Sequence, residues 1–141
     1  MVPATQTAPV SGTPAPDHAP ATTAPAGDHP GGTTLTVLGT PVPPGSSTRL
    51  TWAASQVFEG VSTATPVLVV NGREPGPVLC LTAAIHGDEL NGIEMVRRVL
   101  HELEPEKLKG AVIGIPIVNL QGFRRGSRYL PDRRDLNRYF P

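Results

Sequence analysis

The feature that most constrains the fold is a strand–helix–strand pattern over residues 78–119. An unbroken apolar run, "VLCLTAAI", occupies 78–85, and a second, "AVIGIPIVN", occupies 111–119. Runs without polar alternation are typical of strands covered on both faces, as in parallel sheets. Between them, residues 89–103 repeat apolar side chains every three or four positions, which predicts an amphipathic helix. We therefore predict an α/β fold in which the two runs are parallel strands joined by a right-handed crossover.

Shorter strands are predicted upstream of this unit. The β-branched segments at 33–39, 48–55 and 65–72 each have the length and composition of a strand. The Pro- and Gly-containing segments "TPVPPG" at 40–45 and "REPGP" at 73–77 are predicted loops. Residues 35–141 are thus expected to form a mainly parallel sheet with few of the covering helices that such a sheet needs.

The first 34 residues have a different composition. They hold seven prolines and seven alanines, and they lack lysine, arginine and aromatic residues. Such a segment cannot bury enough apolar surface to offset the entropy lost on ordering. We predict a disordered Ala/Pro/Thr-rich tail over 1–34 and a folded region over 35–141.

Charge and hydropathy exclude several classes of function. Residues 35–141 carry 12 basic and 10 acidic groups, a net charge of +2, which does not predict a nucleic-acid partner. The N-terminus lacks the basic and apolar regions of a secretory signal, and no later window is apolar enough to span a membrane. We expect a cytoplasmic protein without a membrane partner. The single cysteine, Cys80, lies within an apolar run and is predicted to be a buried, inert thiol.

A histidine and a glutamate stand where the first apolar run gives way to the helix. In "IHGDEL", His86 ends the run and Glu89 lies in the first turn that follows. At this spacing both side chains can point to one spot above the sheet edge, and imidazole with carboxylate is a ligand pair that suits zinc. Short spacings of this kind also recur by accident, and the pair alone is better explained by a packed histidine and a glutamate at a helix start.

The segment after Asn119 is polar, irregular and rich in arginine. It leaves the sheet at the same edge as His86, where ligands bind in open α/β sheets. Arg128, Asn137 and Arg138 offer amide and guanidinium donors that suit a substrate carboxylate. The remaining arginines of this segment are expected to be solvated or neutralised by Asp132 and Asp135. These are Arg124, Arg125, Arg133 and Arg134.

Two stretches carry a resemblance to a known family. "AAIHGDELNGIE" followed by "GAVIGIPIVNLQGFRRGSRYLPDRRDLNRYFP" resembles the succinylglutamate desuccinylase/aspartoacylase family, within the zinc carboxypeptidase superfamily. The similarity runs from about residue 35 to the end and is sharpest at 83–94 and 114–141. It implies that 35–141 are the N-terminal part of a three-layer, zinc-carboxypeptidase-like domain.

The resemblance also implies roles for individual residues. His86 and Glu89 match two of three protein ligands to one Zn²⁺ ion. Arg128 matches the arginine that polarises the scissile carbonyl, so it is both a catalytic and a substrate-binding residue. Asn137 and Arg138 match the pair that holds the substrate's carboxylate.

The implied activity is zinc-dependent hydrolysis of an acyl bond in an N-acylated amino acid or similar small-molecule carboxylate. A third ligand, a histidine, and a glutamate base are expected downstream of Pro141, so we expect a truncated enzyme that is inactive alone. The alternative is a non-catalytic fragment whose arginine-rich loop binds acidic ligands or RNA. The sequence predicts no oligomeric state.

Overall fold

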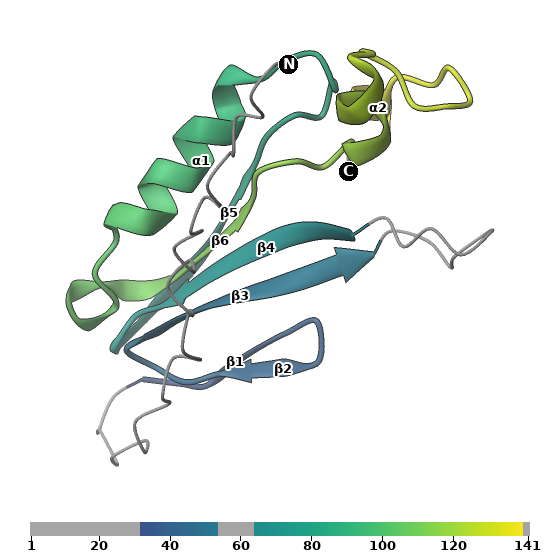
Figure 1. Ribbon diagram of the computed structural model, residues 1–141. Helices are drawn as coiled ribbons and strands as arrows, with labels where there is room; N and C mark the ends of the chain where they lie inside the picture. The colour runs from purple at the N-terminus through teal and green to yellow at the C-terminus, as the bar shows by residue number, and fades with distance from the viewer. Residues whose placement is uncertain (1–31, 54–63, 140–141) are drawn as a thin grey trace, which may run out of the picture.

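A computed structural model describes residues 32–53 and 64–139 of the protein (Figure 1). Six strands and two α-helices make up the regular structure of these residues, with two short 3-10 turns. Their order is β1 Leu35–Val37, β2 Thr40–Val42, β3 Ser46–Ala53, β4 Ala64–Asn71, β5 Glu74–Thr82, α1 Asn91–Glu102, η1 Pro105–Lys107, β6 Lys109–Ile115, α2 Leu120–Arg125 and η2 Leu136–Arg138. Of the predicted tail, only residues 32–34 are described, and residues 1–31 lie outside the described residues. The end of the predicted strand 48–55 also lies outside them.

The main sheet is mixed, so the prediction of a mainly parallel sheet is wrong. Its strand order is β3-β4-β6-β5, and only β5 and β6 pair in parallel, while β3–β4 and β4–β6 are antiparallel. Only Gly72 and Arg73 separate β4 from β5. A parallel crossover needs a dozen residues or more, so this short connection reverses the chain. The predicted strand–helix–strand unit is confirmed: α1 connects the parallel strands β5 and β6.

Each face of the sheet carries its own apolar cluster. On one face α1 contributes Val96 and Leu100, which pack with Val70 of β4 and Val112 of β6. On the other, Val42 of the β1–β2 hairpin packs with Val67 and Val69 of β4 (Figure 1). In the described part, the mixed sheet therefore lies between α1 on one face and the β1–β2 hairpin on the other. No helix within residues 32–53 and 64–139 has the length and apolar character needed to cross a membrane.

Strand β5 is the outer strand of the described sheet, and this corrects the prediction that it is covered on both faces. Eight of its nine residues are exposed, including Val78 and Leu79, each with 54% of its surface accessible. Cys80 is exposed too, so the prediction of a buried thiol is wrong. The apolar run indicated a strand correctly, but nothing in the described residues covers its outer edge.

Two predicted loops contain regular structure. Residues 40–42 of the predicted loop 40–45 form β2, which pairs antiparallel with β1 around the left-handed residues Leu38 and Gly39. Residues 74–77 of the predicted loop 73–77 are the beginning of β5. In both cases strand pairing overrides the turn preference of proline and glycine.

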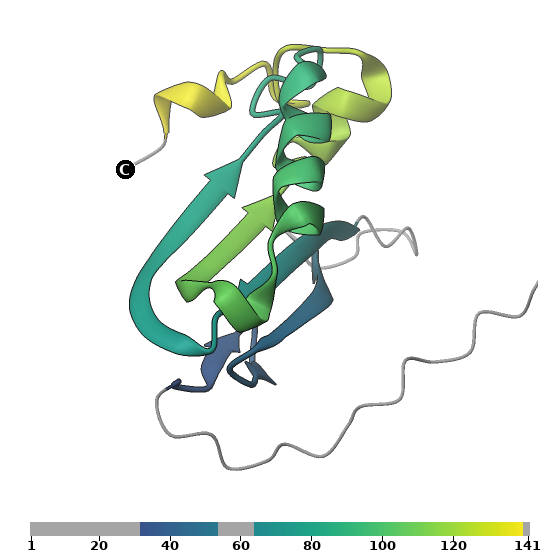
Figure 2. The same ribbon diagram turned by 90° about the vertical axis from the view of Figure 1, so that its left-hand side faces the viewer.

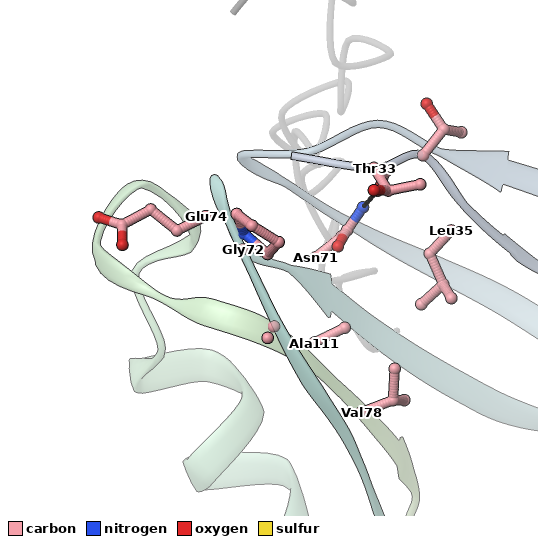
Figure 3. Close-up of a pocket in the computed structure, with 11 residues that line it drawn as sticks. Thr33, Leu35, Asn71, Gly72, Glu74, Val78 and Ala111 are labelled. Carbon is pink, nitrogen blue, oxygen red and sulfur yellow. Dashed lines mark hydrogen bonds between the residues drawn. The ribbon is translucent and has the colours of Figure 1, made fainter. Parts of the chain in front are cut away.

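The reversal between β4 and β5 depends on close contact between backbones. The Gly72 amide donates to the Gly110 carbonyl at 2.7 Å, and a Cβ at Gly72 would lie 2.3 Å from the Leu108 carbonyl oxygen. The buried Asn71 amide donates to the carbonyls of Thr33 and Val42, which ties the hairpin to the sheet. Thr33, Asn71, Gly72 and Gly110 border a cavity of about 130 Å³ (Figure 3). It lies at the amino end of β5, the end opposite to His86.

On the exposed face of α1, Glu94 accepts hydrogen bonds from Arg97 and Arg98, each at 2.6 Å from the arginine Nε. Arg97, and then Arg98, lower the pKa of Glu94 to about 2 from an ordinary 4.5. The folded-state pKa is lowered, so this contribution to stability is present above about pH 4.5 and is lost as the pH falls towards 2.

We expect an NMR titration of the Glu94 carboxyl to have its midpoint near 2. Glu94→Gln should reduce the loss of stability between pH 4.5 and 2, whereas Glu102→Gln should leave it unchanged; equal effects would contradict this assignment.

Candidate functional site

The carboxyl ends of β5 and β6 lie at one edge of the sheet, and the polar segments of the chain gather there. In Figure 2 both strands run upwards to this edge, with α2 and the yellow η2 turn beyond it. Residues 83–90 follow β5, and the segment 116–139 follows β6. His86 therefore lies beside the arginine-rich segment, although 49 residues separate it from Asp135 in the sequence.

His86 lies between two carboxylates. Its Nδ1 is 2.8 Å from Glu89 Oε1, and its Nε2 is 2.9 Å from Asp135 Oδ1. The His86 side chain is 8% exposed and that of Asp135 18%, while 61% of the Glu89 side chain is accessible. The ring is thus fixed from its inner side by Asp135 and faces an accessible carboxylate on its outer side.

The two carboxylates change the protonation of this ring. Burial disfavours the charged imidazolium, but the hydrogen bonds to Glu89 and Asp135 outweigh it, and the pKa of His86 is raised. Burial similarly opposes ionisation of Asp135, yet its hydrogen bonds to His86 and to the Asn137 amide lower its pKa. A neutral imidazole can donate to only one of these acceptors. Because each ring nitrogen faces a carboxylate, the point between Nδ1 and Glu89 favours a positively charged group, which is either the second ring proton or a cation.

Arg128 is the second cation at this point. Its guanidinium lies 3.3 Å from Glu89 Oε1 and 3.8 Å from Asp135 Oδ2, and 42% of its side chain is exposed. The predicted residues Asn137 and Arg138 lie in η2, immediately after Asp135. The Asn137 amide donates to Asp135 Oδ1 at 3.0 Å, whereas the side chains of Asn137 and Arg138 are exposed and make no hydrogen bond within the described residues.

Backbone contacts hold the His86 loop in place. Ala84 has a φ of +47°, uncommon for a residue with a side chain, and its carbonyl accepts the Asn119 amide at 3.0 Å. Gly87 packs directly against α2: a Cβ at this position would lie 2.1 Å from the Gly122 carbonyl carbon. Gly87 therefore allows the close approach of two backbones.

Two side chains at this point are of the types that bind zinc. His86 Nδ1 and Glu89 Oε1 are nitrogen and oxygen donors of the kind that zinc takes, and they lie side by side. A carboxylate on the other ring nitrogen, as Asp135 provides, is the usual partner of a metal-binding histidine, because it orients the ring. Within residues 32–53 and 64–139, no group of three or more His, Cys, Asp or Glu side chains is placed to hold a metal ion. The described residues thus offer two donors and one orienting group.

Two site residues were not predicted from the sequence. Asp135 was interpreted only as a possible neutraliser of arginine, and its bond to His86 joins segments that are distant in the chain. Asn119 is 2% exposed and caps α2, where its Oδ1 accepts the Gly122 amide at 2.8 Å and its Nδ2 donates to the Arg128 carbonyl at 3.5 Å. Asparagine at the end of an apolar run is a helix-start signal, so the prediction of an irregular segment after Asn119 missed α2.

Comparison with known proteins supports an enzyme family. The chain is 40% identical over 77 residues to the N-alpha-acetyl-L-2,4-diaminobutyric acid deacetylase of Halomonas elongata, covering 54% of this chain and 22% of that protein. It is 36% identical over 94 residues to the succinylglutamate desuccinylase of Pseudomonas paraeruginosa, covering 66% and 26%. The chain thus spans about a quarter of the length of these curated relatives.

A solved structure and a match to a protein family point to the same group of enzymes. The crystal structure of succinylglutamatedesuccinylase/aspartoacylase from Rhodobacter sphaeroides is similar with a TM-score of 0.59 and 32% sequence identity. The similarity covers 67% of this chain and 30% of that one. Residues 75–141, which include His86, Glu89 and the arginine-rich segment, match the family described as Succinylglutamate desuccinylase/Aspartoacylase catalytic domain. Through these residues, the chain belongs to the succinylglutamate desuccinylase/aspartoacylase family.

Proposed function

We propose that this chain carries part of the active site of a zinc-dependent deacylase that acts on N-acylated amino acids or similar small carboxylates. One observation carries the proposal: His86 Nδ1 and Glu89 Oε1 lie 2.8 Å apart while Asp135 holds the opposite ring nitrogen. The relatives named above support the reaction class, since their names describe a deacetylase and a desuccinylase. The layering of a zinc carboxypeptidase and a cytoplasmic location stay predictions.

Each residue has a separate role in this proposal. His86 and Glu89 would hold the zinc ion, and Asp135 would orient His86. Zinc supplies Lewis-acid activation of the carbonyl and of the attacking water when it is bound. Arg128, already beside Glu89, would donate to the oxygen on which negative charge develops. Asn137 and Arg138, whose side chains are exposed and unbound in the described residues, would hold the substrate's carboxylate.

The proposal includes negligible hydrolytic activity for the 141-residue protein by itself. Catalytic zinc sites usually have three protein ligands, and His86 and Glu89 provide two. A general base placed at the attacking water typically increases the rate by a further factor of about 10²–10⁴. In the described residues Glu89 and Asp135 are both engaged with His86, so neither is available as that base.

Zinc binding to the purified 141-residue protein tests the metal site. We expect weak binding of about one zinc ion, lost in His86→Ala, and negligible hydrolysis of N-acylated amino acids. His101→Ala is the matched control, because His101 lies in the last turn of α1, twelve residues after Glu89. Zinc binding that survives His86→Ala, or full hydrolytic activity of the short chain, would mean that the site is misplaced. Binding of acidic ligands without any zinc binding would support the non-catalytic alternative.

A further inference from the structure

Asn119 lies where the two halves of the candidate site meet, and none of the roles proposed above belongs to it. It stands between β6 and α2, and 2% of its surface is exposed. A side chain buried to this extent is not accessible to a substrate. Any part that Asn119 has in the reaction therefore acts through the residues that it contacts.

The main chain of Asn119 is bonded to the loop that carries the proposed metal ligands. Its amide donates to the Ala84 carbonyl at 3.0 Å, two residues before His86. Ala84 is 4% exposed and has a φ of +47°, a conformation that persists only where the surrounding structure imposes it. The hydrogen bond from Asn119 is one of the contacts that hold this loop in its strained form.

The side chain of Asn119 is bonded to the segment that carries Arg128. Its Oδ1 accepts the Gly122 amide at 2.8 Å, and its Nδ2 donates to the Arg128 carbonyl at 3.5 Å. These groups are closely packed, because a Cβ at Gly122 would lie 2.5 Å from Nδ2 and 2.7 Å from the Ser127 carbonyl oxygen. Within the part of the chain that the structure describes, the contact with Nδ2 is the only hydrogen bond of the Arg128 backbone.

Capping of α2 does not by itself require an asparagine. Asparagine, aspartate and serine cap helices about equally well, because each offers an oxygen to the free amides of the first turn. A side-chain amide differs from the other two in carrying an acceptor and a donor on separate atoms. The donor of Asn119, which faces the Arg128 carbonyl, is thus the feature that capping leaves unexplained.

We propose that Asn119 is a positioning residue, which holds the backbone of Arg128 so that the guanidinium stays beside Glu89. This role rests on the proposed deacylase function, because it explains how the donor to the developing oxyanion is kept at the proposed metal site. The ion pairs of Arg128 with Glu89 and Asp135 are 3.3 and 3.8 Å long, and 42% of its side chain is exposed. Exposed ion pairs of this kind fix a side chain only weakly. A donor stabilises developing charge best when it is held in place before the reaction, and the bond from Asn119 does this at the backbone.

Asn119→Asp separates positioning from capping. The new carboxylate keeps an acceptor for the Gly122 amide, but it has no donor for the Arg128 carbonyl and repels it. NMR of the 141-residue protein, without zinc and without turnover, reports on both contacts. We expect the Gly122 amide to keep its slow hydrogen exchange and the melting temperature to stay within about 4 °C of the original. The nuclear Overhauser effect between the Arg128 guanidinium and the Glu89 side chain should be lost.

Gln121→Glu is the matched control for the added charge. It makes the same change from amide to carboxylate on an exposed residue of α2 that forms no hydrogen bond within the described residues, and it should leave both signals unchanged. If Asn119→Asp did not fold, Asn119→Ser provides the same test, because a hydroxyl caps the helix and is too short to reach both partners.

Three results would overturn the role of Asn119. The first is an Arg128–Glu89 effect that is absent from the unsubstituted protein or unchanged in Asn119→Asp. The second is an equal loss in Gln121→Glu, which would indicate a general effect of charge. The third is loss of the Gly122 protection together with the Arg128 signal, which would show that Asn119 only caps α2. Failure of zinc binding with the expected Arg128 signals would count against the deacylase function and not against this role.

Discussion

A chimera in which residues 75–141 replace the matching segment of the Pseudomonas paraeruginosa succinylglutamate desuccinylase should hydrolyse an N-acylated amino acid. In that chimera, Arg128→Ala should lower kcat by about 10²–10³-fold, the usual effect of removing one donor to a developing oxyanion. The reason lies in the geometry: Arg128 is 3.3 Å from Glu89, so its guanidinium is at the proposed metal site and not at the rim. Steady-state kinetics on the purified chimera measure the effect.

The controls separate chemistry from folding in this experiment. Arg125→Ala removes an arginine of α2 that has no partner within the described residues, and it should leave kcat within about 2-fold, as for other surface changes away from special features. His86→Ala should abolish both turnover and bound zinc. A chimera that turned over normally with Arg128→Ala would show that this arginine has no catalytic role. An inactive but folded and zinc-loaded chimera would argue against deacylase chemistry in this segment.

Gly87→Ala should disrupt the site and destabilise the protein by about 3 kcal/mol, at the upper end of the cost of overpacking. The new methyl group would lie 2.1 Å from the Gly122 carbonyl carbon and 2.2 Å from the Phe123 amide nitrogen. Both neighbours are backbone atoms, so the clash cannot be relieved by a side-chain rotation. Relief requires α2 and the His86 loop to separate, which also moves Arg128 away from Glu89. Chemical denaturation gives the stability change, and NMR shifts of the His86 ring report the change in the site.

Gly39→Ala is the appropriate control for this prediction. Gly39 has a φ of +76° in the β1–β2 turn, and a Cβ there would have no heavy atom within 4 Å. The substitution should cost about 1–2 kcal/mol through backbone strain alone and leave the His86 ring unchanged. If Gly87→Ala were no more destabilising than Gly39→Ala and left the His86 signals in place, the contact between the loop and α2 would not be required for the site.

The parts of the fold that follow from periodicity could be predicted. The helix at 89–103 is α1 at 91–102, and the two apolar runs are the parallel strands β5 and β6. The position of each strand in the sheet could not, because an apolar run indicates that a strand lies against something without identifying its neighbour. The placement of β6 between β4 and β5 depends on the two-residue reversal at Gly72 and on non-local hydrogen bonds.

The same distinction applies to the candidate site. The spacing of His86 and Glu89 predicted that their side chains face one another, and the structure places them 2.8 Å apart. Their role as metal ligands stays a prediction. Asp135 could not be identified in this way, because no local pattern shows that a carboxylate 49 residues away will bond to the other ring nitrogen.

The position of β6 between two earlier strands also affects how a nascent chain matures. Strands β3 and β4 can form their hairpin once Asn71 has been synthesised, but the partner that joins β4 to β5 begins only at Lys109. The last residue of β5, Thr82, precedes Lys109 by 27 residues, which take about 1–5 s to translate at about 5–20 residues per second. During that time β5 has no partner on either side, and Val78, Leu79 and Leu81 are accessible to other chains. Nascent chains on one polysome therefore expose the same unpaired apolar strand to each other. A chaperone that binds unfolded chains would have most effect on yield during this interval.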